Sequence, residues 1–119
     1  MITIRRLITS ISFLALFASV AASAAEPAAK CKAPDATKGQ ALAGVCAGCH
    51  GADGQSPIPT QPNLAGMSGA YIAKQLAHFK SSQRDNAIMK GFAANVAECD
   101  ARDIGAYFAA KPGRTIGTK

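Results

Sequence analysis

The chain contains no tryptophan and little other aromatic material, since Phe, Tyr and Trp together make up 6% of its 119 residues. A domain with so few large side chains can build only a limited hydrophobic core from its own residues. Small domains with so limited a core are usually stabilised by disulfides, a metal or a cofactor. The composition therefore predicts that something besides the protein's own side chains completes its interior.

Long apolar runs, basic runs and strand patterns are also missing. The longest apolar run, Leu7–Val20, is about fourteen residues long, whereas a membrane span needs roughly twenty. Lys and Arg are scattered rather than clustered, which argues against binding to nucleic acid. No stretch alternates apolar and polar residues in the manner of a half-buried strand. The sequence therefore disfavours an integral membrane protein, a nucleic-acid-binding protein and a β-rich fold.

The first residues have the three parts of a secretory signal peptide. Arg5 and Arg6 precede the apolar run, and Ala22-Ser23-Ala24 supplies small residues of the kind that a signal peptidase reads. We expect residues 1–24 to be removed, with the cut after position 24 or 25, and the mature protein to reside in the periplasm. The alternative is an uncleaved membrane anchor. Removal lowers the formal charge from +6 to +4, a mild basic bias that would favour an acidic partner.

The remaining chain is predicted to contain an extended tether, residues 25–35, and one domain, residues 36–119. Asp35 is a good N-cap residue, and a first helix is predicted to run from it to Gly48. Ser68 can cap a second helix, which is predicted to end near Ser81.

Residues 82–96 are expected to form a loop with a short helical turn at 87–90. A last helix is predicted to open at Asp100, with Asp103 in its first turn, where the helix dipole favours a negative charge. Pro112 and the glycine after it end this helix. The sequence thus predicts an all-α fold with three main helices and long loops, and such loops make sense when they surround a cofactor.

The motif Cys46-Ala47-Gly48-Cys49-His50 lies at the end of the first predicted helix. C-x-x-C-H is a sequence typical of c-type haem attachment. Two cysteines three positions apart lie on one side of a helix, where each can add to one vinyl group of the porphyrin. His50 can then approach the iron from one face. The motif predicts one covalently bound haem c, which would also supply the missing hydrophobic core.

Three other interpretations of the motif remain open. A thioredoxin-like redox pair would follow a strand in a βαβ unit, which this helical sequence does not predict. A zinc site would need two further ligands, and Cys31, Cys99 and His78 do not form a second pair at zinc-finger spacing. The third possibility is a structural disulfide between Cys46 and Cys49.

A six-coordinate haem iron would need a second axial ligand from a later part of the chain. The candidates are Met67, His78 and Met89. Met89 is favoured, because it lies in a predicted loop that could place its thioether over the iron. Met67 could instead pack in the interior, and His78 is expected on the surface of the second helix.

Five short segments occur in an order typical of one protein family. They are Cys46–Gly54, Pro62–Gly66, Tyr71 with Gln75-Leu76, Ile88–Gly91 and Asp103–Phe108. With them, the sequence resembles a class I bacterial cytochrome c, in particular one half of the two-haem periplasmic cytochromes, in a single-haem form. The resemblance implies the small cytochrome c fold, with His50 and Met89 as axial ligands. It also implies that the Pro62 carbonyl accepts a hydrogen bond from the other ring nitrogen of His50.

The same resemblance implies a function. The protein is expected to be a soluble monomeric electron carrier rather than an enzyme, exchanging electrons with redox partner proteins as its iron cycles between ferric and ferrous states. The alternatives are a haem subunit of a larger periplasmic redox enzyme and a sensor with an open iron site. Lys74, Lys80, Arg84 and Lys90 could lie near the haem edge and attract an acidic partner.

Cys31 and Cys99 are not needed to hold a haem. Two further cysteines in an oxidising compartment suggest a disulfide. In the family fold the helices that follow these two residues pack against each other, so the resemblance allows a Cys31–Cys99 bridge. The alternative is that the two cysteines are buried or make intermolecular bonds.

Overall fold

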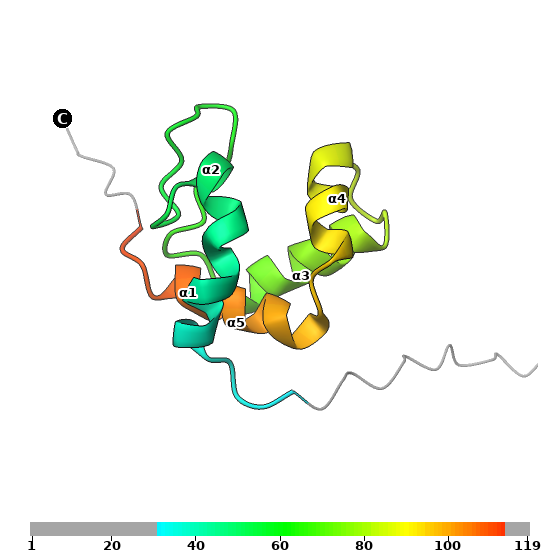
Figure 1. Cartoon of the computed structure of the whole chain (residues 1–119). Helices are drawn as coiled ribbons and strands as arrows, with labels where there is room; N and C mark the ends of the chain where they lie inside the picture. Colours follow the sequence, from blue (N-terminus) through cyan, green and yellow to red (C-terminus); the bar gives the residue numbers. More distant parts are fainter. Residues whose placement is uncertain (1–30, 114–119) are drawn as a thin grey trace, which may run out of the picture.

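The computed structural model describes residues 31–113, so the predicted signal peptide and most of the predicted tether lie outside the described residues (Figure 1). Within this range the protein is helical and has no strand, as the sequence predicts. None of these helices is both long and apolar enough to span a membrane. The elements in chain order are α1 (Ala36–Leu42), the 3₁₀ helix η1 (Ala43–Cys46), α2 (Ala47–His50), α3 (Gly69–Lys80), α4 (Ala87–Ala94) and α5 (Glu98–Ala109).

The first three elements follow one another without a break and form a single helical stretch that ends at His50. Its start agrees with the prediction, because the Asp35 side chain accepts hydrogen bonds from the backbone N–H groups of Thr37 and Lys38. Its end lies two residues beyond the predicted one. Gly51 then adopts a φ of +79°, a conformation that glycine reaches at little cost, and terminates the stretch. The attachment motif is therefore helical throughout.

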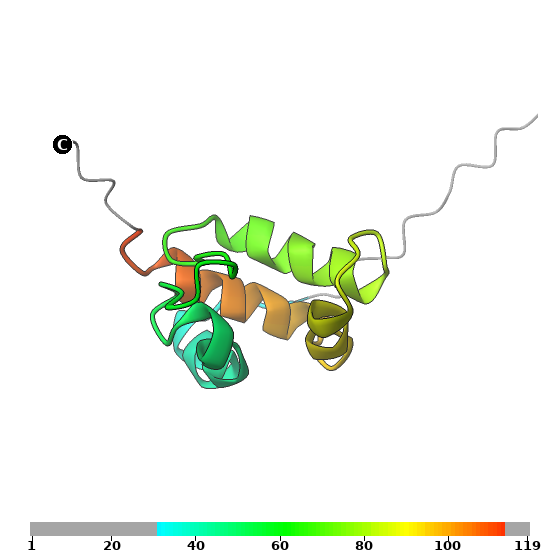
Figure 2. The ribbon, with the colours of Figure 1, turned by 90° about the horizontal axis from the view of Figure 1, so that it is seen from above.

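Helices α3 and α5 lie side by side and form the base of the domain, with α1 and α4 at its two ends (Figure 2). A Cβ on Gly105 of α5 would overlap the backbone of Gly69 on α3, so the two glycines allow the helices to approach closely. The buried cluster around this contact is small, and Phe108 is fully buried in it. Its members are Ala43, Ile72, Ile104, Tyr107 and Phe108.

Helix α4 corrects the sequence prediction. Residues 87–90 were expected to form a single turn in a loop, but the helix continues to Ala94. The Asn86 side chain caps its first turn, Ala93 is only 1% exposed, and the helix packs against α3. Met89 therefore lies in a helix rather than in the predicted loop.

Helix α5 also differs from the prediction at its start. It begins at Glu98 rather than at Asp100, with Ala97 as its N-cap residue, so Asp103 lies beyond the first turn. The acidic residues of the first turn, where a negative charge interacts favourably with the helix dipole, are Glu98 and Asp100. The Asp103 carboxylate instead accepts a hydrogen bond of 2.9 Å from the backbone N–H of Asp35. The helix ends at Ala109, and Lys111 lies beyond it with its ammonium group over the Tyr107 ring.

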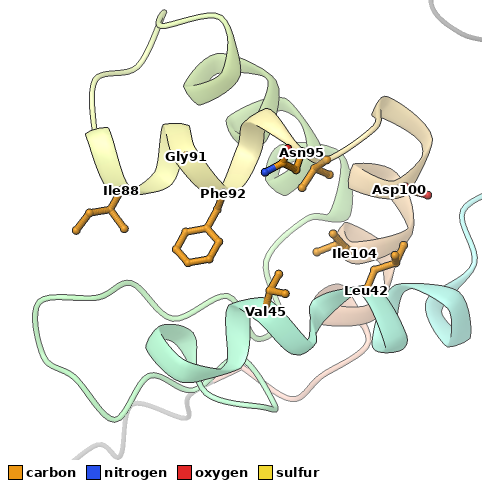
Figure 3. A pocket seen from close by; sticks show the side chains of 9 residues that line it. Leu42, Val45, Ile88, Gly91, Phe92, Asn95, Asp100 and Ile104 are labelled. Carbon is orange, nitrogen blue, oxygen red and sulfur yellow. The ribbon is translucent and has the colours of Figure 1, made fainter.

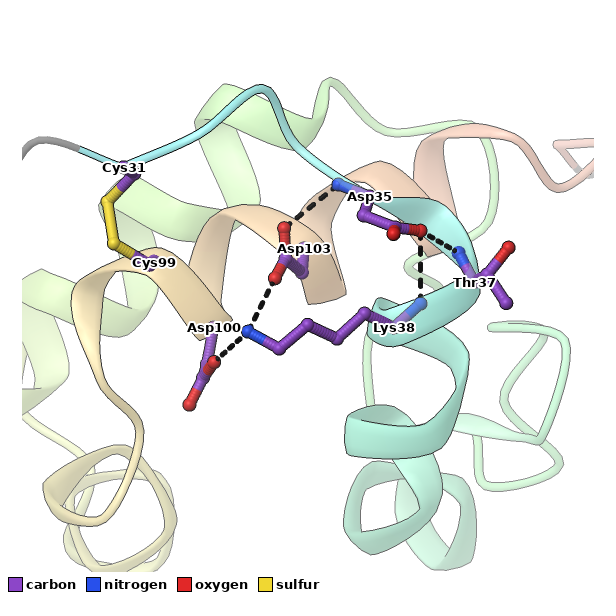
Figure 4. A network of polar contacts seen from close by, with 7 residues as sticks. All are labelled: Cys31, Asp35, Thr37, Lys38, Cys99, Asp100 and Asp103. Atoms are coloured by element: carbon purple, nitrogen blue, oxygen red, sulfur yellow. Dashed lines mark hydrogen bonds and ion pairs between the residues drawn. A yellow bond between two sulfur atoms is a disulfide. The ribbon is translucent and has the colours of Figure 1, made fainter.

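A disulfide and an ion-pair network fasten the start of the domain to α5 (Figure 4). Cys31 is bonded to Cys99, with their Cα atoms 5.4 Å apart. The Lys38 ammonium lies 2.7 Å from a carboxylate oxygen of Asp100 and 3.0 Å from one of Asp103. These contacts join residues more than sixty positions apart, and they hold α1 against α5.

The Asp103 carboxylate makes the stability of the domain sensitive to acid. The Asp35 N–H, and then Lys38, lower the pKa of Asp103 in the folded protein. A carboxylate with a lowered pKa contributes stability above its unfolded value of about 3.9, and this contribution is lost as the pH falls further through the folded value. We expect the free energy of unfolding to fall below about pH 4, and we expect Asp103→Asn to flatten this dependence in urea titrations. Asp85→Asn, on the exposed 81–86 loop, is the control, and an equal effect of both variants would contradict the assignment.

Candidate haem-binding site

A cleft separates the helical stretch of the attachment motif from α4. It consists of two adjoining cavities of about 590 and about 100 Å³. Both cavities are lined by Val45, Ile88, Phe92, Val96 and Ile104, so they are parts of one continuous space. Figure 3 shows Ile88 and Phe92 on one wall and Val45 on the other, with Ile104 of α5 between them. The size and the apolar lining are typical of a site for an organic cofactor.

The walls of the cleft expose apolar side chains that a water-soluble domain would ordinarily bury. Val45 is 65% exposed, Ile88 66% and Phe92 46%. Complete burial of such a side chain stabilises a protein by roughly 1.5–3 kcal/mol. Gly91, which also lines the cleft, has nothing within 4 Å of the position that a Cβ would take. A flat apolar group between the walls would cover all three side chains and fit against Gly91.

Cys46 and Cys49 lie on the wall formed by η1 and α2, and neither is bonded to another cysteine. Their spacing of three residues places both thiols on the same face of the helical stretch. Burial raises the pKa of the Cys46 thiol, so this group stays protonated at neutral pH. The two free thiols are the groups that thioether bonds to a porphyrin require.

The other interpretations of the motif do not agree with the structure. Cys46 and Cys49 are free, which contradicts a structural disulfide between them. No strand precedes the motif within residues 31–113, which contradicts a thioredoxin-like arrangement. The same residues contain no group of three or more His, Cys, Asp or Glu side chains that could hold a metal ion, which contradicts a zinc site.

His50 is buried, with 6% of its surface exposed, and it lines the cleft beside the two cysteines. Its Nδ1 lies 2.8 Å from the carbonyl oxygen of Pro62. This distance fits a hydrogen bond in which Nδ1–H donates, which leaves Nε2 unprotonated and able to bind a metal. The Pro62 carbonyl therefore fixes both the tautomer and the orientation of the ring.

A hydrogen-bonded loop holds Pro62 in place. The Ser56 hydroxyl lies 2.8 Å from the carbonyl oxygen of Cys49, and the Ser56 N–H donates to the Asn63 side chain at 2.8 Å. The Tyr107 hydroxyl of α5 donates to the Ala52 carbonyl at 2.7 Å. Two of these contacts attach the first part of the loop to the helices, and the Ser56–Asn63 bond joins that part to the residue after Pro62. They were not foreseen from the sequence, because no local pattern identifies the partner of an isolated Ser, Asn or Tyr.

Met89 lines the cleft from the α4 side, together with His50 and the two cysteines. The other two candidate ligands are elsewhere. Met67 packs against the core cluster, and His78 is not among the residues that line the cleft. Of the three candidates, the structure brings only Met89 to the cavity that contains His50.

The four basic residues expected near the haem edge fall into two groups. Lys80 donates to the Val96 carbonyl at 3.0 Å, and Arg84 donates to the Gln75 side chain at 2.6 Å. Their side chains are therefore engaged in holding the segment around α4. All four of these residues are exposed.

The residues of the cleft thus fit a haem, with two free thiols, an imidazole whose Nε2 is available, a thioether and apolar walls. Residues 36–109 match the cytochrome c family. The chain belongs to the cytochrome c family. Family membership and the Cys46–His50 motif together indicate covalent haem c attached through Cys46 and Cys49.

Among curated proteins, this cytochrome c is 47% identical over 79 residues to cytochrome c4 of Pseudomonas aeruginosa. The match covers 66% of this chain and 39% of that protein, so the chain spans less than half of its relative. It is 35% identical over 82 residues to cytochrome c-554(548) of Halomonas halodenitrificans, covering 66% of this chain and 99% of that protein.

Comparison with solved structures likewise matches the chain to about half of a cytochrome c4. The reduced recombinant cytochrome c4 from Pseudomonas stutzeri matches with a TM-score of 0.65 and 37% identity. The match covers 69% of this chain and 48% of that one. The resemblance to one half of a two-haem cytochrome, and the all-α cytochrome c fold, are therefore confirmed.

Proposed function

We propose that this cytochrome c is a soluble periplasmic carrier of single electrons, with His50 and Met89 as the axial ligands of its haem. The observation that carries the proposal is the cleft, in which His50 and the two free cysteines line one side and Met89 lies on α4 at the other. Cys46, Cys49, His50 and Met89 would hold the haem in this cleft, with His50 and Met89 as the protein ligands of its iron. The bound haem would supply the one-electron chemistry.

The protein's own residues would set the properties of that centre. The Pro62 carbonyl keeps His50 in one orientation, which limits rearrangement when the oxidation state changes. A thioether from Met89 favours ferrous iron and raises the reduction potential. With haem bound, the apolar walls would exclude water and disfavour the extra charge of the ferric state, which would act in the same direction. We therefore expect a positive potential.

Axial ligands on both faces would also exclude small molecules from the iron. This feature distinguishes an electron carrier from a haem sensor, which needs an open coordination position. We propose that the mature chain is monomeric, reaches the periplasm after removal of residues 1–24, and exchanges electrons with redox partner proteins.

The visible spectrum and redox titration of the purified, exported protein test this proposal. We expect a pyridine haemochrome spectrum of thioether-linked haem, one haem per chain and one reversible one-electron transition. The reduced protein should take up carbon monoxide only slowly at neutral pH. A folded but colourless helical protein would contradict the proposal. Rapid carbon monoxide binding would favour a sensor, and a stoichiometric co-purifying protein would favour a subunit of a larger redox enzyme.

A further inference from the structure

The segment that carries Met89, residues 81–96, is fastened to the domain by little apolar contact. Apart from Ala93, which is buried, and Met89 and Val96, which are half-buried, its residues are exposed. Among the helices, α4 has its main contacts with α3. Segments with few buried contacts open at low free-energy cost. A bound haem would add apolar contact with Ile88 and Phe92, and the polar contacts of the segment help to fix the position of the Met89 backbone.

The side chains of Arg84 and Lys80 help to hold the two ends of the segment to α3. At its start, Arg84 donates to the Gln75 side chain at 2.6 Å, and its guanidinium lies 4.6 Å from the centroid of the Phe79 ring. At its end, Lys80 donates to the carbonyl of Val96 at 3.0 Å. These contacts fix where the segment leaves and rejoins the domain, but they do not touch Met89.

Asn86 makes the contact that reaches Met89 directly. It is the N-cap residue of α4, with an extended backbone, and its side-chain oxygen accepts a hydrogen bond of 2.9 Å from the Met89 N–H. Its carbonyl accepts the Lys90 N–H at 2.8 Å, which is the first hydrogen bond of the helix. Asn86 also lines the cleft beside Met89. The cap therefore joins the side of the cleft to the backbone from which the Met89 side chain extends.

We propose that Asn86 is the positioning residue for the Met89 ligand, a role that rests on the proposed function of Met89 as an axial ligand. By capping α4, Asn86 keeps the first turn helical and holds the Met89 backbone at a fixed place beside the cleft. Without the cap, the first turn would fray more readily, because the Met89 N–H would lose its partner. The thioether would then spend more time away from the iron.

Carbon monoxide uptake by the reduced holoprotein measures how often the Met89 thioether is away from the iron, because the gas can bind only when the thioether has left it. We expect Asn86→Ala to accelerate uptake by roughly five- to thirtyfold, the change that corresponds to loss of a helix cap. We also expect a lower reduction potential. Asn86→Ser keeps a cap-forming oxygen and should restore values close to those of the unaltered protein.

Asp35→Ala is the matched control, because it removes the N-cap of α1 at a helix start that does not carry Met89. It should lower the unfolding midpoint but leave carbon monoxide uptake unchanged. Unaltered uptake in Asn86→Ala, or equal effects of Asn86→Ala and Asn86→Ser, would overturn the positioning role of Asn86. Neither result would affect the proposal that Met89 is a ligand. If Met89→Ala itself leaves uptake and potential unchanged, the axial ligand assignment and the positioning role both fail.

Discussion

Replacing Cys46 and Cys49 together with alanine is expected to give an exported chain that carries no covalently attached haem. Both thioether bonds are lost, and His50 and Met89 would hold the ring only reversibly. The cleft would then leave the Val45, Ile88 and Phe92 side chains in water. We also expect lower helicity and a lower thermal midpoint, because the buried cluster of this domain is small. Haem staining after denaturing electrophoresis measures attachment, and circular dichroism measures folding.

The double variant Cys31→Ser with Cys99→Ser is the control for this experiment. It removes two cysteines as well, but these lie in the disulfide and do not line the cleft. It should lose stability, by roughly 2–4 kcal/mol for a loop of this length, and still retain haem through denaturation. Covalent haem in the Cys46/Cys49 double variant would contradict attachment at the motif.

Replacing Met89 with alanine is expected to lower the reduction potential and open the iron to small ligands. Loss of the thioether removes a group that favours the ferrous state. The expected fall is on the order of 0.1 V or more, within the range of about 0.8 V that axial ligands set across haem proteins. Spectroelectrochemical titration measures the potential, and stopped-flow mixing with carbon monoxide measures access to the iron.

Met67→Ala separates this ligand effect from a general loss of packing. Met67 packs against the core cluster and does not line the cleft. Its replacement should lower the thermal midpoint while leaving the potential and the carbon monoxide rate close to their original values. The reverse result, with a potential that responds to Met67 and not to Met89, would identify Met67 as the ligand.

The attachment motif and the first helical stretch could be predicted because their determinants are local. Asp35 caps the residues next to it, and the spacing of Cys46, Cys49 and His50 is a property of one short segment. The full length of helix α4 was not predicted, because its apolar residues do not form the regular stripe of a helix that packs on a hydrophobic core. Ile88 and Phe92 are exposed along the cleft, and only Ala93 is buried, so the usual periodicity of a packed helix is weak.

Apart from the Cys31–Cys99 bridge and the Pro62–His50 hydrogen bond, for which the family resemblance supplied the expectation, contacts between distant residues could not be predicted from the sequence. The sequence predicted that Asp103 interacts with a helix dipole, whereas the structure pairs it with Lys38 and the Asp35 backbone. Arg84 and Lys80 were expected near the haem edge as charges that attract a partner, and the sequence did not show that both also hold the segment that carries Met89. In each case the partner lies at a distance along the chain that no local pattern encodes.

The bridge between Cys31 and Cys99 has a consequence for how the chain matures. With the export proposed above, the new polypeptide would carry four thiols, of which one pair must be oxidised while the other stays reduced until the porphyrin arrives. Of all single bridges that these four cysteines could form, only this one leaves both Cys46 and Cys49 available. Premature oxidation within the motif would make a short, closed ring that cannot accept the vinyl groups. Assembly of this cytochrome thus depends on the order of two reactions. Cys31 and Cys99 must form the disulfide, and Cys46 and Cys49 must stay reduced until the haem is attached.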